Sequence, residues 1–185
     1  MTDPPAVYAL SPGGARDYWT LLHPPYTLWH LSFVVLGACI VDTIDVGYLL
    51  LAIAAFFLAV GGFLVPAYNL EWFSGRFHSD LWFAVMWGGF PALAGGFAQT
   101  GRTSVPLVLI AAGCGAVAAA QRRLSTPVRQ LRRTATTVSG VVTFEGGASH
   151  PVDIAMMTAA PEGALRVLWL AMVLLAAGEV LARWP

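Results

Sequence analysis

Residues 105–120, VPLVLIAAGCGAVAAA, carry no charged side chain and consist mostly of alanine, glycine and valine. Sixteen helical residues extend about 24 Å, which approaches the roughly 30 Å thickness of a bilayer's hydrocarbon core. Small side chains allow neighbouring helices to approach one another backbone to backbone. This segment, Val105–Ala120, therefore predicts a membrane-spanning helix in the middle of a helical bundle.

Four more apolar segments surround this one: Thr27–Ile44, Val46–Phe73, Leu81–Phe97 and Ala164–Leu181. Hydrophobic residues make up 57% of the chain and charged residues 11%, against roughly a quarter charged in an average soluble domain. The sequence therefore predicts an all-α, polytopic transmembrane helical bundle with about five spans. Because no linker divides the chain, we expect one integral membrane domain over residues 1–185, with residues 1–17 as a loose N-terminal arm.

The basic residues are unevenly distributed. All ten are arginine, and five of them lie between the fourth and fifth apolar segments: Arg122, Arg123, Arg129, Arg132 and Arg133. Arginine-rich loops stay on the cytoplasmic side of a membrane. With an odd number of spans this predicts a cytoplasmic N-terminus, and we expect the cytoplasmic membrane of a prokaryote.

Residues 122–160 are expected to form a cytoplasmic interfacial segment. Leu124, Val128 and Leu131 recur at helical spacing with arginines between them, which predicts an amphipathic helix on the membrane surface, opened by Ser125 as cap and Pro127 in the first turn. Two later stretches stay open: residues 141–144 as a short strand or a turn, and residues 151–157 as a second interfacial helix.

The joint between the second and third apolar segments, YNLEWFSGRFHSD at residues 68–80, places several polar and ionisable side chains at a membrane boundary: Asn69, Glu71, Arg76, His78 and Asp80. Such groups are costly near the bilayer and are often functional. In one interpretation they pair with one another, as Glu71 with Arg76 or Arg76 with Asp80, while His78 or Ser79 caps the next helix.

In the other interpretation the joint binds a ligand. Glu71 and Asp80 would hold Mg²⁺, which prefers carboxylate oxygens together with phosphate and water. A phosphate-bearing substrate would be bound by Asn69, Arg76, His78, Arg122 and Arg123. Topological anchoring is the competing explanation for the last two arginines.

Several other site classes lack their motifs. The chain has no HExxH, CxxC, GxSxG or GxxxxGK[ST] pattern, so these motifs give no support for a zinc, thiol, serine-hydrolase or nucleotide-triphosphatase mechanism. Cys39 and Cys114 lie in apolar segments and are expected to be buried thiols. Glu179 and Arg183 are one helical turn apart and are expected to pair. We expect a lipid bilayer as a partner and no nucleic acid.

Three stretches resemble the UbiA-like membrane prenyltransferase superfamily: LLHPPYTLWHLSFVVLGACI (21–40), VPAYNLEWFSGRFHSDLWFAVMWGGFPALAGGFAQTG (65–101) and QRRLSTPVRQLRR (121–133). The resemblance implies a bundle of about nine helices in which two aspartate-rich motifs hold Mg²⁺ and an isoprenyl diphosphate for transfer of the isoprenyl group. Asn69 and Glu71 fall where one such motif ends a helix. The aspartate-rich pair itself is absent, and the chain has about five spans, so a segment is hypothesised to be missing near Ala59–Phe63.

The function expected from these observations is a prenyltransferase-related membrane protein that binds an isoprenyl diphosphate with Mg²⁺ at the cytoplasmic face, with catalysis left open. The alternative is a non-catalytic membrane subunit or scaffold that packs through small-residue helices, as a homo-oligomer or with a partner subunit. A weaker alternative is a small transporter, for which Glu179, Pro66 and Pro91 are the relevant residues.

Overall fold

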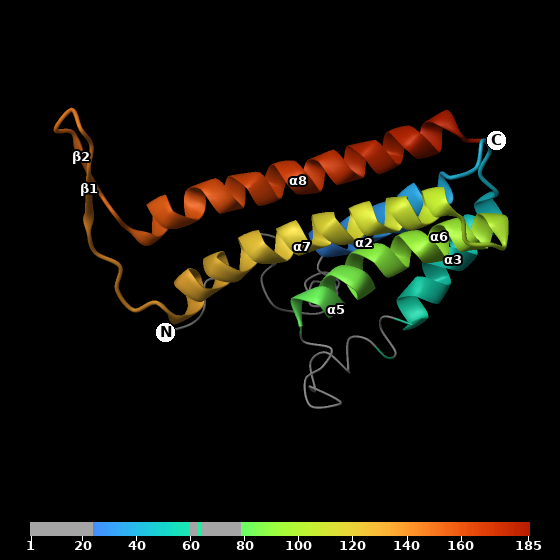
Figure 1. Ribbon diagram of the computed structural model, residues 1–185, viewed down its shortest axis with the longest axis horizontal. Helices are drawn as coiled ribbons and strands as arrows, with labels where there is room; N and C mark the ends of the chain where they lie inside the picture. Colours follow the sequence, from blue (N-terminus) through green and yellow to red (C-terminus); the bar gives the residue numbers. More distant parts are fainter. Residues whose placement is uncertain (1–23, 60–62, 64–78) are drawn as a thin grey trace, which may run out of the picture.

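The computed structural model describes residues 24–59, 63 and 79–185 (Figure 1). The described residues are mostly helical, with a small β-hairpin between the last two helices. In chain order the elements are α2 (Pro24–Ala38), α3 (Val46–Ala59), α5 (Asp80–Ala84), the π-helical turn η3 (Val85–Gly89), α6 (Phe90–Thr100), α7 (Val105–Thr134), β1 (Val141–Thr143), β2 (Ser149–Pro151) and α8 (Ile154–Ala182).

Three described helices are long and apolar enough to cross a membrane: the continuous helix Asp80–Thr100, which comprises α5, η3 and α6, together with α7 and α8. They indicate a membrane protein. The prediction of five spans is supported only in part, because α2 and α3, with 15 and 14 described residues, extend only about 22 Å each. The predicted extension of the second span to Phe73 lies outside the described residues, as does the hypothesised deletion except for Ala59 and Phe63.

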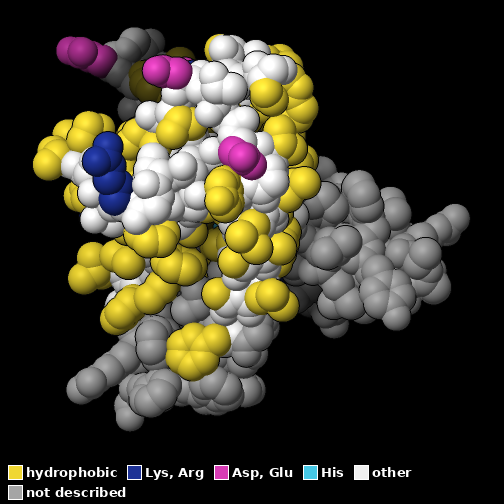
Figure 2. Space-filling view, turned by 90° about the vertical axis from the view of Figure 1, so that its right-hand side faces the viewer, with side chains coloured by type: hydrophobic (Ala, Val, Ile, Leu, Met, Phe, Trp, Pro, Cys, Tyr) yellow, Lys and Arg dark blue, Asp and Glu magenta, His cyan; other side chains and the backbone are white. Residues whose placement is uncertain are grey.

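The two ends of the bundle differ in charge. The end that carries the C-terminus and the α6–α7 connection shows mostly hydrophobic and uncharged side chains, with few charged groups (Figure 2). The clustered arginines of α7 lie toward the opposite end, from which the hairpin projects (Figure 1). We call the end with the C-terminus the C-terminal end, and the end from which the hairpin projects the hairpin end.

Helices α2 and α6 touch through glycine. A Cβ atom built on Gly95 would lie 1.9 Å from the carbonyl oxygen of Val34, and one built on Gly37 would lie 1.8 Å from the carbonyl oxygen of Ala92. Any side chain at either glycine would therefore push the two helices apart. The small-residue packing expected from the sequence is realised at this contact.

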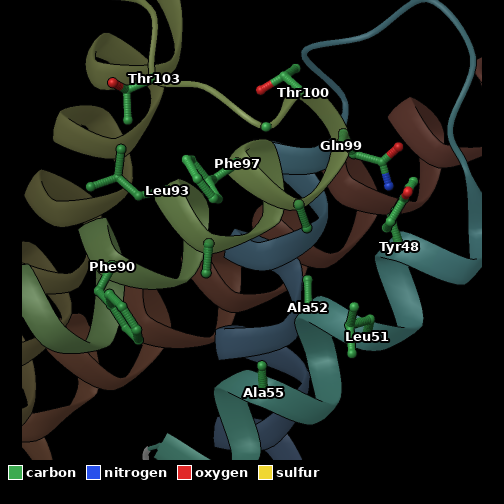
Figure 3. A pocket seen from close by; sticks show the side chains of 13 residues that line it. Tyr48, Leu51, Ala52, Ala55, Phe90, Leu93, Phe97, Gln99, Thr100 and Thr103 are labelled. Carbon is green, nitrogen blue, oxygen red and sulfur yellow. The ribbon is translucent and has the colours of Figure 1, made fainter.

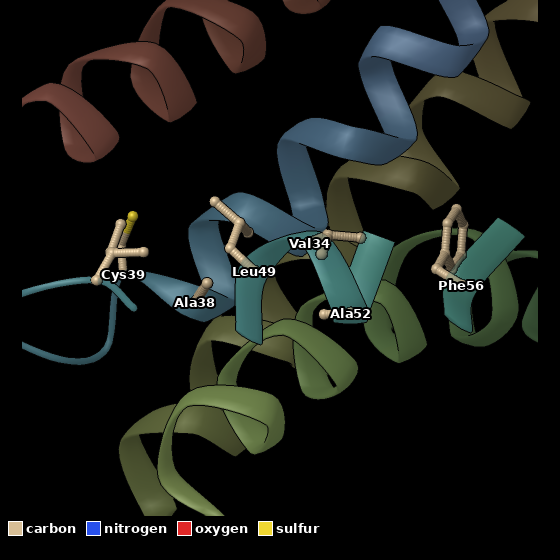
Figure 4. Packing of buried hydrophobic residues seen from close by; sticks show 7 residues of the cluster. Val34, Ala38, Cys39, Leu49, Ala52 and Phe56 are labelled. Atoms are coloured by element: carbon tan, nitrogen blue, oxygen red, sulfur yellow. The ribbon is translucent and has the colours of Figure 1, made fainter. Parts of the chain in front are cut away.

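Two groups of buried residues form the core. One joins α2 to α3 over α6 and includes Val34, Leu49, Ala52 and Phe56 (Figure 4). The other joins α2, α6, α7 and α8 and is centred on Phe33, which is fully buried. Helix α2 therefore lies at the centre of the bundle and contacts every other long helix.

Helix α7 buries one stripe of residues whose spacing alternates between four and three: Leu107, Ala111, Cys114, Ala118, Gln121, Ser125 and Val128. This heptad spacing is typical of helices that cross at a shallow angle. The predicted helix start at Ser125 is wrong, because α7 begins at its cap Ser104 and continues through Pro127 to Thr134. Pro127 removes the backbone hydrogen bond to the Arg123 carbonyl and its ring crowds that carbonyl, yet the helix continues past it. The hydroxyls of Ser125 and Thr126 both donate to the Arg122 carbonyl, at 3.2 and 2.8 Å, and the buried stripe continues to Val128.

Beyond Arg122, α7 runs beside α8 past the start of α5 (Figure 1). We call residues 122–165 the arm. Arg132 Nε lies 2.5 Å from Glu162 Oε1 and ties its two helices together. At the far end of the arm, β1 and β2 form the hairpin, in which Val141 pairs with Pro151 in antiparallel register.

The sequence left open whether residues 141–144 form a strand or a turn, and whether residues 151–157 form a second interfacial helix. Residues 141–143 are a strand, so the bundle is not wholly α-helical. The second interfacial helix does not begin at Pro151, which ends β2. Instead Asp153 caps α8 by accepting a hydrogen bond from the Met156 N–H at 2.7 Å.

Candidate functional site

The start of α5 carries the one predicted site that the described residues bring together. Ser79 caps this helix by accepting a hydrogen bond from the Trp82 N–H at 3.2 Å, which places Asp80 in the first turn. Asp80 Oδ1 lies 2.5 Å from Arg122 Nε on α7. The Arg122 guanidinium carbon also lies 5.0 Å from the centre of the Phe83 ring, within range of a cation–π interaction. The site is thus a fixed guanidinium beside a carboxylate.

The two partners differ in exposure. The Arg122 side chain is 12% exposed, whereas that of Asp80 is 76% exposed. The arginine is therefore held largely within the protein, and the carboxylate faces outward. Arg123, the next residue, is exposed and forms no ion pair among the described residues.

The other predicted site residues, Asn69, Glu71, Arg76 and His78, lie outside the described residues. Among the residues that are described, no group of three or more His, Cys, Asp or Glu side chains could hold a metal ion. Asp80, already paired with an arginine, supplies one of the two predicted magnesium ligands. Sequence reasoning placed Arg122 at the same end of the bundle as Asp80 but did not pair them.

Replacing Asp80 with asparagine is expected to change the free energy of unfolding by less than about 1 kcal/mol, because an ion pair with one exposed partner is screened by water. Chemical unfolding in detergent, followed by circular dichroism, measures the change. The matched control is Glu162→Gln, which removes the corresponding carboxylate of the Arg132 pair. A loss of 3 kcal/mol or more, the range of about 3–5 kcal/mol for a broken buried pair, would contradict the exposed position of Asp80.

A second polar site lies inside the bundle, between α2 and the π-helical turn. His30 Nδ1 lies 2.9 Å from the carbonyl oxygen of Trp87. A carbonyl only accepts hydrogen bonds, so Nδ1 carries the proton and donates it. The ring centres of Trp87, Phe33 and Phe56 lie 5.0, 6.4 and 6.4 Å from that of His30.

Proline explains why this carbonyl needs a partner. Pro91 follows Trp87 by four residues and has no N–H to return to it. In the preceding turn the Phe90 N–H reaches back five residues to the Val85 carbonyl, which defines the π-helical geometry. His30 therefore donates to a carbonyl that has no N–H four residues later. The signal in the sequence was a histidine in one apolar segment and a proline inside another, but sequence reasoning considered His30 only with His23.

The remaining predicted side chains have structural roles. Cys39 and Cys114 are buried free thiols, as expected, and both line a cavity of about 410 Å³ between α2, α7 and α8. Glu179 and Arg183 form the expected ion pair one turn apart at the C-terminal end of the same cavity.

Comparison with protein-family models, with curated proteins and with solved structures found no match to this chain. The resemblance to UbiA-like prenyltransferases therefore remains a prediction from the quoted stretches, and the functional argument depends on the structure and the sequence alone.

Proposed function

We propose that this protein is a non-catalytic membrane scaffold that presents its arm to a partner outside the membrane. The observation that carries the proposal is the length of α7 and α8. With 30 and 29 residues, each extends about 45 Å, well beyond a hydrocarbon core of roughly 30 Å. At the hairpin end the Arg132–Glu162 ion pair links the surplus turns of the two helices.

The arm has a distinct surface chemistry. Arg122 and Arg132 are engaged in ion pairs, whereas Arg123, Arg129 and Arg133 are exposed and form no ion pair among the described residues. Arg129 and Arg133 are four residues apart, so these two exposed arginines lie on one face of α7. Arg122, seven residues before Arg129, lies on the same face. By the positive-inside rule this end is cytoplasmic and the N-terminus lies on the same side. The surface suits an acidic partner subunit or an acidic surface on a second copy.

The double variant Arg129→Glu/Arg133→Glu is expected to lose the partner, because like charges then face each other across the contact. Size-exclusion chromatography with light scattering, on protein extracted in a mild detergent, should show a complex for the wild type and a monomer for the variant. The control, Arg102→Glu, changes an exposed arginine at the C-terminal end and should leave the complex intact. A wild-type monomer, or an unchanged complex in the double variant, would contradict the scaffold proposal.

The second candidate function is binding of an isoprenyl diphosphate with Mg²⁺. The favouring observation is that Arg122 is held in place by Asp80 and Phe83, with Arg123 exposed next to it, where residues 68–78 lead into α5. Oriented guanidinium groups bind phosphate oxygens well. Transfer of the isoprenyl group would need further ligands from the chain or from a partner.

Calorimetry of an isoprenyl diphosphate with detergent-purified protein, with and without Mg²⁺, distinguishes the two functions. Magnesium-dependent binding that falls at least tenfold in both Asn69→Ala and Glu71→Ala would support the diphosphate site. The matched control is Gln130→Ala, an exposed arm residue, which should bind as the wild type does. No binding in any sample would leave the scaffold proposal and remove the second candidate.

A further inference from the structure

A groove of about 920 Å³ lies between α3 and α6 (Figure 3). Its floor consists of alanines from both helices: Ala52, Ala55, Ala94 and Ala98. Larger apolar side chains, such as Leu51 and Phe97, rise on either side. The groove exists because alanines face each other where larger side chains would fill the space between the two helices.

A pair of hydrogen bonds holds the groove together at the C-terminal end. The Gln99 side chain accepts a hydrogen bond from the Asp45 N–H at 2.9 Å and donates one to the Asp45 carbonyl at 2.8 Å. This clamp fixes the start of α3 to the end of α6. The two helices that line the groove are therefore held together at this end.

The polarity of the lining changes along the groove. From Phe90 to Phe97 the α6 wall is apolar, and the C-terminal end is rimmed by Tyr48, Gln99, Thr100 and Thr103. Gln99 is occupied by the clamp, and the Thr100 hydroxyl lies 2.8 Å from both the Gly96 and Arg102 carbonyls. The hydroxyls of Tyr48 and Thr103 make no hydrogen bond among the described residues. Among the residues that the structure describes, no charged side chain lines the groove.

The dimensions match one leaflet of a bilayer. The eleven residues from Phe90 to Thr100 extend about 15 Å between their first and last Cα atoms, half of a hydrocarbon core of roughly 30 Å. Over that length the volume of about 920 Å³ gives a mean cross-section of about 60 Å². A space of this length and width admits an extended hydrocarbon chain.

We propose that this groove binds one acyl chain of a glycerolipid from the leaflet at the C-terminal end. The chain lies along the alanine floor, and the hydroxyl of Tyr48 donates a hydrogen bond to an ester oxygen at the level where the glycerol backbone meets the hydrocarbon. This site is separate from the arm and does not depend on the scaffold function.

The experiment compares bound lipid in the wild type and in a filled variant, Ala55→Leu/Ala94→Leu. Protein purified in mild detergent with added phosphatidylethanolamine is examined by native mass spectrometry, and a phosphatidylethanolamine with a photoreactive acyl chain is used to map the contact. We expect one retained lipid on the wild type, cross-linked to α3 or α6, and at least a fivefold loss in the filled variant. The control Ala112→Leu adds one leucine at an exposed position of α7 and should retain the lipid.

A second variant keeps the test independent of folding. Tyr48→Phe removes one hydroxyl at an exposed position and should reduce retention about threefold without changing the melting temperature. Retention that is equal in the wild type and the filled variant would overturn the proposal. A wild type that retains no lipid would also overturn the proposal. If that protein forms a dimer cross-linked through α3 and α6, a second copy of the chain occupies the groove.

Discussion

Replacing Gly95 with alanine is expected to destabilise the bundle by about 3 kcal/mol, the upper end of the typical range for overpacked cores. The added Cβ atom would lie 1.9 Å from the Val34 carbonyl oxygen, which belongs to the backbone of α2 and cannot rotate away. Helices α2 and α6 must therefore separate. Gly37→Ala should act similarly, because its Cβ atom would meet the Ala92 carbonyl from the opposite side.

The measurement is chemical or thermal unfolding in detergent, followed by circular dichroism. Gly113→Ala is the matched control, because nothing lies within 4 Å of a Cβ atom at that position. It should be neutral or slightly stabilising, since alanine is the better helix former. The double variant Gly37→Ala/Gly95→Ala should cost less than the two single losses added together, because one separation of the helices relieves both clashes. If Gly95→Ala unfolds like Gly113→Ala, the described contact between α2 and α6 is wrong.

Replacing His30 with phenylalanine is expected to cost about 2 kcal/mol. The ring volume is kept among the aromatic neighbours, but the Trp87 carbonyl loses its donor, and an unsatisfied buried polar group costs roughly 1–3 kcal/mol. The same substitution should cost much less in a Pro91→Ala background. There residue 91 regains an N–H that can return to Trp87 once the turn relaxes to α-helix.

The four proteins of this double-mutant cycle are compared by unfolding in one detergent. A coupling energy of about 1 kcal/mol or more between positions 30 and 91 is the expected result. The control is His150→Phe in the exposed hairpin, which should be neutral. Equal losses in both backgrounds would mean that His30 stabilises the bundle by packing alone and has no specific link to the proline.

The helical membrane character could be predicted from the sequence because long apolar runs carry that information locally. Which residues of different helices contact one another could not be predicted. Nothing in the pattern near Gly37 and Gly95 distinguishes them from Gly113, since the difference is which helix faces each glycine. The same applies to His30, whose partner is 57 residues away.

Asp80 and Arg122 were expected at one face of the membrane from the distribution of arginines along the sequence, and the structure joins the two in an ion pair. Their role in binding a ligand stays a prediction. The helix start at Ser125 was wrong because a serine followed by a proline has the pattern of a cap, while burial of Val128 and Gln121 on the same stripe favours a continuous α7. Buried stripes outweigh a capping signal once a helix has neighbours on both sides.

The glycine contact also sets an order of events during biosynthesis. Because α2 binds α6 and His30 bonds to a carbonyl 57 residues later, α2 has no partner for these groups when it first leaves the ribosome. At roughly 5–20 residues per second the wait is about 3–11 s. Trp169 of α8 donates to the Pro25 carbonyl, 144 residues earlier, so the bundle closes only after α8 has been synthesised. During that interval α2 needs lipid or an insertase as a temporary neighbour, and a pause in translation between α3 and α6 would lengthen its exposure.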